Sequence, residues 1–245
     1  MKLAGFGCSC MYGFNGDARG IPNKKNSVGY QLSNLINRDW LNKAINGSGN
    51  DLIYEKVITS HYSGEINPKD TFVLIGWSEG FRRKVFHKDK VWTTFRPDVT
   101  LDSPDIEYWD AHTEALFSDY FMNTNQNYYD SLTSIIGTYH LLENYGYQYL
   151  MFDALTVLND GQGKEIDDYQ INEFWIPKEF IKLKNNIPNY YLKHQYNLYL
   201  ESLYESGKMP FLSDDDHHPN EYGAKEFAKI LYKEIKDKKK NKTIS

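Results

Sequence analysis

The chain has 245 residues, a mass of 28.7 kDa and a formal net charge of -5, with 40% hydrophobic and 25% charged residues. This length fits one α/β core, so we expect a single domain over residues 1–245. The weak negative charge gives no attraction to nucleic acid or to anionic membranes, so we expect neither partner and a small-molecule ligand instead.

The N-terminal segment favours a cytoplasmic location. The apolar stretch after Lys2 is too short for the core of a signal peptide or for a membrane span. The two cysteines of the chain, Cys8 and Cys10, are too close in sequence for an unstrained disulfide, which agrees with a reducing compartment.

The first half of the chain predicts strands alternating with helices. A short apolar run predicts a strand over 2–6, followed by a glycine-punctuated loop over 7–20 and a helix over about 27–37. The turn at 47–51 precedes a segment with apolar residues at helical spacing. The continuous apolar run 71–76 is typical of a strand that a parallel sheet buries on both faces.

The second half continues the alternation. Residues 84–110 show no clear period and are expected to form a long excursion over the substrate side. The remaining expected elements are a helix over 114–143 interrupted at 123–127, a strand over 147–152, a helical region from Pro177 through 204, and a last helix from Pro219 that buries Phe227, Leu231 and Ile235. Residues 237–245 are expected to be a frayed, lysine-rich tail. This order predicts an α/β fold with a central parallel sheet.

Ser9 is the first candidate for a catalytic side chain. It follows the first predicted strand, and glycines at positions 7 and 13 allow the sharp turn that would expose its hydroxyl. A serine hydroxyl is a weak nucleophile that needs a neighbouring base, usually a histidine oriented by a carboxylate. Most serines in glycine-rich loops are simply turn residues, so Ser9 needs a partner.

The segment 213–220 (SDDDHHPN) supplies that partner. Asp215 and His218 are three residues apart, so a helical turn leading into Pro219 would place the carboxylate beside the imidazole. The pair Asp214 and His217 has the same spacing. The proline directly after His218 favours Asp215 with His218.

Four short blocks of the chain resemble those of the SGNH, or GDSL-like, hydrolase superfamily. Gly7-Cys8-Ser9 with Gly13 resembles the first block, Asn42–Ser48 the second, Gly76–Glu79 the third and Asp215–Pro219 the last. The resemblance spans nearly the whole chain and implies a three-layer α/β/α, flavodoxin-like fold. It implies that Ser9, His218 and Asp215 form a triad and that Gly47 and Ser78 serve the oxyanion.

The resemblance also implies an acyl-enzyme mechanism without a cofactor or metal. The substrate would be a small-molecule or carbohydrate ester, and acetylated sugars, short esters, lysophospholipids and thioesters all suit such a site. Two positions depart from the family pattern: Cys8 replaces the usual Asp, and Ser78 replaces the usual Asn donor. The Gly-Trp-Ser form of the third block, followed by Arg82 and Arg83, is similar to a branch often found in phage-encoded proteins.

Three other interpretations stay open at this stage. A metal site could use the acidic and histidine side chains of 214–218, although ligands from one turn rarely converge on one ion. Cysteine catalysis through Cys8 or Cys10 is the second, against the simpler interpretation that both are small buried residues. The third is a binding or structural module, for instance virion-associated, that has the fold without the turnover.

Overall fold

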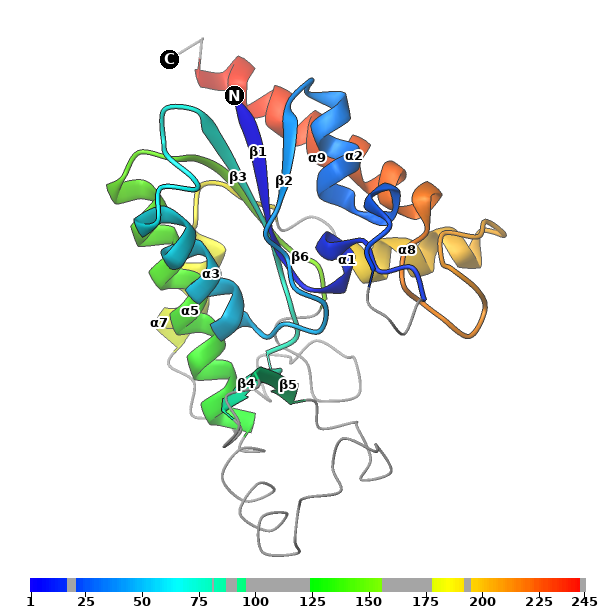
Figure 1. Cartoon of the computed structure of the whole chain (residues 1–245), viewed down its shortest axis with the longest axis horizontal. Helices are drawn as coiled ribbons and strands as arrows, with labels where there is room; N and C mark the ends of the chain where they lie inside the picture. Colours follow the sequence, from blue (N-terminus) through cyan, green and yellow to red (C-terminus); the bar gives the residue numbers. More distant parts are fainter. Residues whose placement is uncertain are drawn as a thin grey trace, which may run out of the picture.

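The computed structural model describes residues 1–16, 21–80, 82–86, 92–95, 124–155, 178–191 and 195–242, and has the expected α/β architecture (Figure 1). A five-stranded, fully parallel sheet has the strand order β2-β1-β3-β6-β7. The strands are β1 (Lys2–Gly7), β2 (Asp39–Asn42), β3 (Thr71–Trp77), β6 (Gln148–Asp153) and β7 (Tyr190–Tyr191). Counted along the chain this is the order 2-1-3-4-5, which is that of flavodoxin-like sheets.

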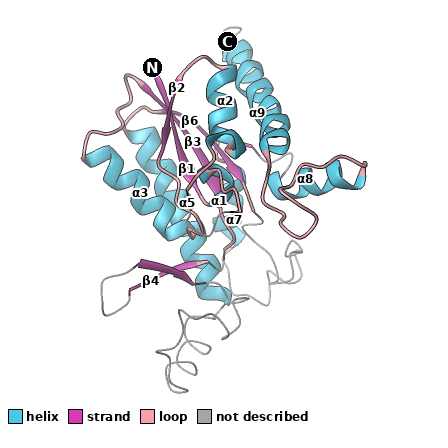
Figure 2. Ribbon diagram, turned by 45° about the vertical axis from the view of Figure 1, so that its right-hand side comes forward, coloured by secondary structure: helices cyan, strands magenta, loops and turns pink. Residues whose placement is uncertain are grey.

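Helices cover both faces of the sheet and make three layers (Figure 2). One face carries α2 (Val28–Leu35), α8 (Tyr196–Glu205) and α9 (Glu221–Lys242), and the other carries α3 (Asn50–Tyr62), α5 (Thr124–Asn144) and α7 (Lys178–Asn185). Successive residues of a strand point to opposite faces. Leu74 therefore packs in the core under α2 and α9, and Val73 in the core under α3 and α5.

Two glycines let α2 approach the sheet closely. A Cβ at Gly5 in β1 would lie 1.9 Å from Cη2 of Trp40, and a Cβ at Gly29 in α2 would lie 2.1 Å from the same atom. The Trp40 indole of β2 therefore fills the space that both glycines leave. This packing brings α2 against the edge of the sheet that begins with β2.

The structure confirms the predicted strands around 2–6, 71–76 and 147–152, and adds elements that were not expected. A short helix, α1 (Ser9–Tyr12), lies within the predicted loop 7–20. The predicted helical region up to 204 was wrong at Tyr190–Tyr191, which form β7 between two helices. Strand β2 was also missed.

The predicted excursion 84–110 contains part of an antiparallel hairpin, β4 (Arg83–Phe86) with β5 (Trp92–Phe95). Residues 87–91 and 96–110 lie outside the described residues, as do Pro177 and the first part, 114–123, of the predicted long helix.

The last helix differs at both ends from the prediction. It begins at Glu221, because Pro219 instead pairs with Phe211 in an isolated bridge. It continues to Lys242, so residues 237–242 of the expected lysine-rich tail are helical. Phe227 and Leu231 are buried as expected, and Ile235 packs against them while partly exposed. Among the described helices, none is long and apolar enough to cross a bilayer.

Candidate active site at the carboxyl ends of β1 and β3

The strand order marks one place on the sheet as the natural ligand site. The chain leaves β1 toward β2 on one side and later returns to β3 on the other, so the connections diverge between β1 and β3. In open parallel sheets, ligands bind at the carboxyl ends of the strands where this reversal occurs. Ser9 follows β1, Ser78 follows β3 and Gly47 follows β2, so three predicted site residues come from this edge (Figure 1).

Ser9 is the first residue of α1 and is 4% exposed. The backbone N–H of Gly13 donates to the Ser9 carbonyl at 3.0 Å and ends the helix in the left-handed conformation, with φ 86°. A Cβ at Gly13 would lie 2.5 Å from the carbonyl oxygen of Asn23. Glycine is therefore required here on two counts, which explains the tight turn that holds Ser9.

Side chains from neighbouring segments hold the end of α1. The Ser27 hydroxyl donates to the Met11 carbonyl at 2.6 Å, and the Asn42 amide donates to the Tyr12 carbonyl at 3.0 Å. Ser27 also accepts from the N–H of Tyr30 at the start of α2. These bonds satisfy carbonyls that a short helix leaves unpaired, so the position of Ser9 is determined by several elements.

The turn that contains Gly47 is attached to the end of β1. Gly47 has φ 74°, in the left-handed region that glycine adopts readily. The Ile45 N–H and the buried Ser48 hydroxyl both donate to the Gly7 carbonyl, at 3.0 and 2.9 Å. The second predicted block thus lies directly beside the first.

Ser78 is fully buried at the end of β3. Its N–H donates to Oδ1 of Asn50 at 2.8 Å, and its carbonyl accepts from Nδ2 of Asn50 at 2.9 Å. Its Oγ is buried and makes no hydrogen bond within the part of the chain that the structure describes. A hydroxyl in this state has a donor to offer to a ligand.

The two cysteines on either side of Ser9 are free and buried. The S–H of Cys10 donates to Cys8, and this bond together with the nearby Arg82 guanidinium lowers the pKa of Cys8 to about 6, against the effect of burial. The pKa of Cys10 is raised well above its ordinary value by the same hydrogen bond and by burial. Arg82 is 8% exposed and forms an ion pair with Glu79.

A pH-dependent stability follows from the lowered pKa of Cys8. An unfolded thiol titrates near pH 8.5, so between about pH 6 and that value the folded state binds fewer protons than the unfolded state. The stabilisation from Cys8 should therefore grow as the pH rises through this window and be lost as the pH falls toward 6. We expect the difference in Tm between the wild type and Cys8→Ala to widen from pH 6 to pH 8.5 in thermal unfolding.

Cys10→Ala is the matched control for this measurement, because it removes the donor and leaves Cys8 in place. In the Cys10→Ala background, replacing Cys8 with alanine should change the pH dependence of Tm less than it does in the wild type. A Tm difference between wild type and Cys8→Ala that stays constant across the window would show that Cys8 does not titrate there.

The carboxylate beside His218 is Asp216, not the predicted Asp215. Oδ1 of Asp216 lies 2.6 Å from Nδ1 of His218 and accepts the backbone N–H of the same residue at 3.0 Å. Asp215 is exposed and makes no hydrogen bond or ion pair with the rest of the described chain. The prediction of an Asp215–His218 contact assumed a helical turn. A residue before proline is disfavoured in the helical region, and 212–218 form bends and irregular backbone instead.

His217 has a different role. Its Nδ1 lies 3.0 Å from a carboxylate oxygen of Glu201, its Nε2 lies 3.1 Å from the Asp214 carbonyl, and its ring stacks on Phe211 at 4.6 Å. Both ring nitrogens therefore have oxygen partners within the protein. Nε2 of His218, in contrast, has no hydrogen bond within the described residues. Of the two histidines, His218 is therefore the one with a ring nitrogen that has no hydrogen-bond partner in the described part of the chain.

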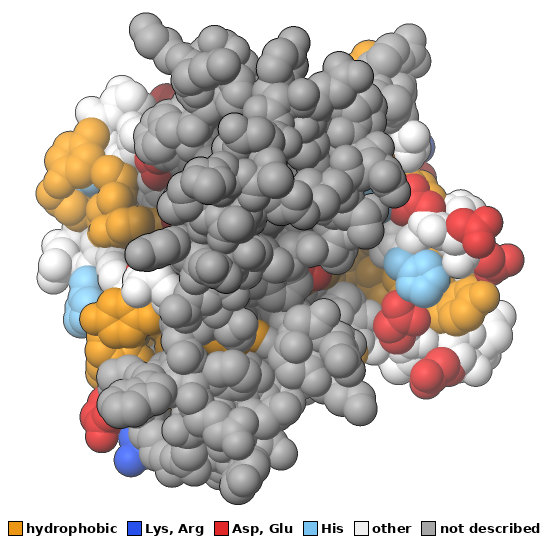
Figure 3. Space-filling view, turned by 90° about the horizontal axis from the view of Figure 1, so that it is seen from below, with side chains coloured by type: hydrophobic (Ala, Val, Ile, Leu, Met, Phe, Trp, Pro, Cys, Tyr) orange, Lys and Arg blue, Asp and Glu red, His pale blue; other side chains and the backbone are white. Residues whose placement is uncertain are grey.

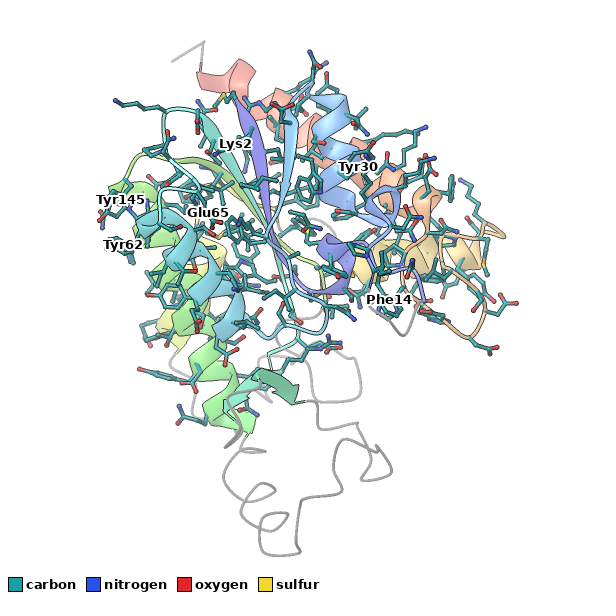
Figure 4. All side chains as sticks on the ribbon, in the orientation of Figure 1. Lys2, Phe14, Tyr30, Tyr62, Glu65 and Tyr145 are labelled. Atoms are coloured by element: carbon teal, nitrogen blue, oxygen red, sulfur yellow. The ribbon has the colours of Figure 1, made fainter. Side chains whose placement is uncertain are left out.

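Phe14 connects His218 to the Ser9 turn. The His218 ring packs on the Phe14 ring with centroids 4.3 Å apart, and the Phe14 N–H lies 3.3 Å from the Ser9 carbonyl. Figure 4 shows Phe14 on the side of α1 that faces the segment between α8 and α9. No hydrogen bond joins Ser9 to His218 in the described structure, and Phe14 links the two residues by contacting both.

The segment before α9 carries acidic and histidine side chains. Seen from below, acidic and histidine side chains gather on the flank where α8 lies (Figure 3). In the residues that the structure describes, no three His, Cys, Asp or Glu side chains converge as metal ligands would. The contacts of His217 and His218 instead go to separate carboxylates, Glu201 and Asp216.

Sequence reasoning missed three residues of this neighbourhood: Phe14, Asn50 and Asp216. Asp216 could have been found from the sequence, because an aspartate side chain in a turn often accepts the backbone N–H of the residue two positions later. Asn50 and Phe14 had none, since their contacts depend on segments 28 and 204 residues away in the chain, respectively.

No protein-family model matches the sequence, and no curated protein matches it either. Solved structures do. A member of the lipolytic protein G-D-S-L family from Veillonella parvula is 11% identical over 96% of each chain, with a TM-score of 0.51. The psychrotrophic esterase EstA from a Pseudoalteromonas species is 11% identical over 100% of each chain, with a TM-score of 0.48.

A catalytic mutant of the acetylxylan esterase Axe2 from Geobacillus stearothermophilus is 12% identical over 96% of this chain and 93% of its own, with a TM-score of 0.49. At such identities the likeness to the Veillonella protein shows the fold: a central parallel sheet between helices, arranged as in that lipolytic protein.

Proposed function

We propose that this chain is a serine ester hydrolase in which Ser9 is the nucleophile, His218 the general base and Asp216 the carboxylate that orients His218. One observation carries the proposal. A buried serine follows each of the two strands between which the connections diverge, and a histidine–carboxylate pair packs beside the first through Phe14. This combination offers a nucleophile, a base and an oxyanion donor at one edge of the sheet.

The proposed reaction begins with attack of the Ser9 hydroxyl on the ester carbonyl. Nε2 of His218 takes the serine proton, while Asp216 accepts a hydrogen bond from Nδ1–H and so sets the tautomer. His218 then returns the proton to the leaving alcohol, and a water molecule hydrolyses the acyl-enzyme with the same base. The Ser9–His218 hydrogen bond would form in the substrate complex, as catalytic hydrogen bonds often do.

The oxyanion would be stabilised at the same edge. Backbone N–H groups of Ser9 and Gly47 and the free Oγ of Ser78 are the proposed donors. Losing one such donor costs on the order of 10²–10³ in kcat, so the Ser78 hydroxyl matters for the rate. With Ser9 only 4% exposed, a short acyl group such as acetyl is the proposed acyl part, and small alcohols or sugars are the proposed alcohol part.

The test is active-site labelling together with hydrolysis. A fluorophosphonate probe should label the purified wild-type chain, and p-nitrophenyl acetate should be hydrolysed faster than the p-nitrophenyl ester of an eight-carbon acid. A panel of acetylated sugars then identifies the alcohol. Absence of both labelling and hydrolysis would contradict the proposal and favour a binding module with this fold.

A further inference from the structure

Asn50 is the residue that joins the second and third site segments. It is the first residue of α3, is 1% exposed and lies 28 residues before Ser78 in the chain. Its amide accepts the Ser78 N–H at 2.8 Å and donates to the Ser78 carbonyl at 2.9 Å. One side chain therefore pairs with both backbone groups of one residue, as a neighbouring strand would beyond the end of β3.

This double contact determines where the Ser78 hydroxyl points. The peptide groups on both sides of Ser78 are fixed by Asn50, so the Cα–Cβ direction of Ser78 is fixed as well. Nδ2 also donates to the hydroxyl of Ser131 in α5, a bond on the side of the amide away from Ser78's own backbone contacts. Rotation of the amide would break both of its bonds to the Ser78 backbone, so these two bonds fix the plane of the amide.

The same turn is attached to the end of β1. Ser48, two residues before Asn50, donates to the Gly7 carbonyl at 2.9 Å. Between them, Gly49 must lack a side chain, because a Cβ there would lie 2.1 Å from the Arg82 carbonyl oxygen. The segment from Gly47 to Asn50 thus contacts the ends of both β1 and β3 at close range.

We propose that Asn50 is a positioning residue that holds the Ser78 hydroxyl and the Gly47 N–H in one arrangement for the oxyanion. The inference rests on the proposed ester hydrolysis and assigns to Asn50 no contact with substrate. An oxyanion donor is effective only when it is already in place, and a displacement of about 1 Å can cost roughly 10²-fold in rate. Loss of the Asn50 amide should therefore lower kcat about 10²-fold and leave KM within about threefold.

The variants Asn50→Ala and Asn50→Asp test this with p-nitrophenyl acetate. Asp has nearly the same shape and can still accept the Ser78 N–H, but an ionised carboxylate cannot donate to the Ser78 carbonyl. It serves where the alanine variant fails to fold. Ser131→Ala is the matched control, because it removes a buried bond to Asn50 while both bonds to Ser78 remain. Its kcat should stay within about twofold of the wild type.

A double-mutant cycle separates positioning from general stability. If Asn50 acts through the Ser78 hydroxyl, Asn50→Ala should cost about 10²-fold in the wild type and much less in the Ser78→Ala background. Additive losses would overturn the inference, as would a folded Asn50→Ala or Asn50→Asp variant with the kcat of the wild type.

Amide hydrogen exchange at Ser78 keeps the two proposals distinguishable. The Ser78 N–H should exchange slowly in the wild type and in Ser131→Ala, and faster in Asn50→Ala. If the wild type labels with fluorophosphonate but the Asn50 variants are unaffected, only the present inference fails. If the wild type neither labels nor hydrolyses any ester, the proposed function fails and the positioning role fails with it, even if the exchange results are as expected.

Discussion

Ser9→Ala should lower ester hydrolysis by about 10⁴-fold or more and abolish fluorophosphonate labelling. The reason is chemical: the hydroxyl is the proposed atom that bonds to the acyl group, and no water molecule held by the remaining groups replaces a covalent intermediate at the same rate. Folding should be unaffected, because the change removes one oxygen atom from a residue at the start of a short helix. Initial rates with p-nitrophenyl acetate and a gel of the labelled chain measure both effects.

The controls for Ser9 are the cysteines on either side of it. Cys8→Ala and Cys10→Ala should keep labelling and most of the hydrolysis, since both thiols are buried core residues. Loss of hydrolysis in Cys8→Ala, with hydrolysis retained in Ser9→Ala, would instead identify a thiol nucleophile. That result would contradict the proposed serine mechanism.

Asp216→Asn should lower kcat by about 10³–10⁴-fold, whereas Asp215→Asn should change it less than about twofold. Asp216 is the carboxylate within 2.6 Å of Nδ1 of His218, and an asparagine there can no longer fix the tautomer that leaves Nε2 free. Asp215→Asn makes the same chemical change one residue away, on an exposed side chain that forms no hydrogen bond or ion pair with the other described residues. The two variants therefore differ only in the position of the same substitution. Their steady-state kcat and KM values are measured and compared.

The reverse result would be equally informative. A severe loss in Asp215→Asn with a normal Asp216→Asn would mean that the segment before Pro219 adopts the helical turn when substrate binds. His218→Ala should abolish turnover in either case. An active His218→Ala variant together with an inactive His217→Ala variant would contradict both assignments, because it would require His217 to leave Glu201 and the Asp214 carbonyl.

The elements that can be predicted from the sequence are those that are stabilised by burial of their own apolar side chains. The run 71–76 reads as a strand because it is apolar throughout, and the structure buries every residue of β3. Strand β2 has only exposed or half-buried residues, and β7 has two residues, so neither carries a pattern of its own. Both form because a neighbouring strand offers backbone partners, β1 to β2 and β6 to β7, which is a tertiary effect.

The residues of the candidate site also fall into two groups: those that a local sequence pattern indicates and those that depend on tertiary contacts. Glycines at 7 and 13 indicated the Ser9 turn, the Asp and His side chains of 213–220 indicated a base with its carboxylate, and the resemblance to the SGNH blocks indicated Gly47. The carboxylate partner of His218 could not be predicted by counting residues, because a three-residue separation brings side chains together only in a helix and Pro219 opposes one. The role of Asn50 could not be predicted from the sequence, because its partners, Ser78 and Ser131, come together only when α3 and α5 pack on one face of the sheet.

The position of β7 at the sheet edge implies an order in which the native chain opens. Strands β1 and β3 each have a partner on both sides, whereas β7 is a two-residue edge strand that pairs with β6 alone. Its Tyr190 hydroxyl also bonds to Asp153 at the end of β6. Edge elements with few backbone bonds open at low free energy, and central strands open only near the global limit. A molecule with β7 transiently detached would therefore keep the ends of β1 and β3, which carry Ser9 and Ser78, intact. Mild heating should detach β7 at a lower temperature than the one at which esterase activity is lost.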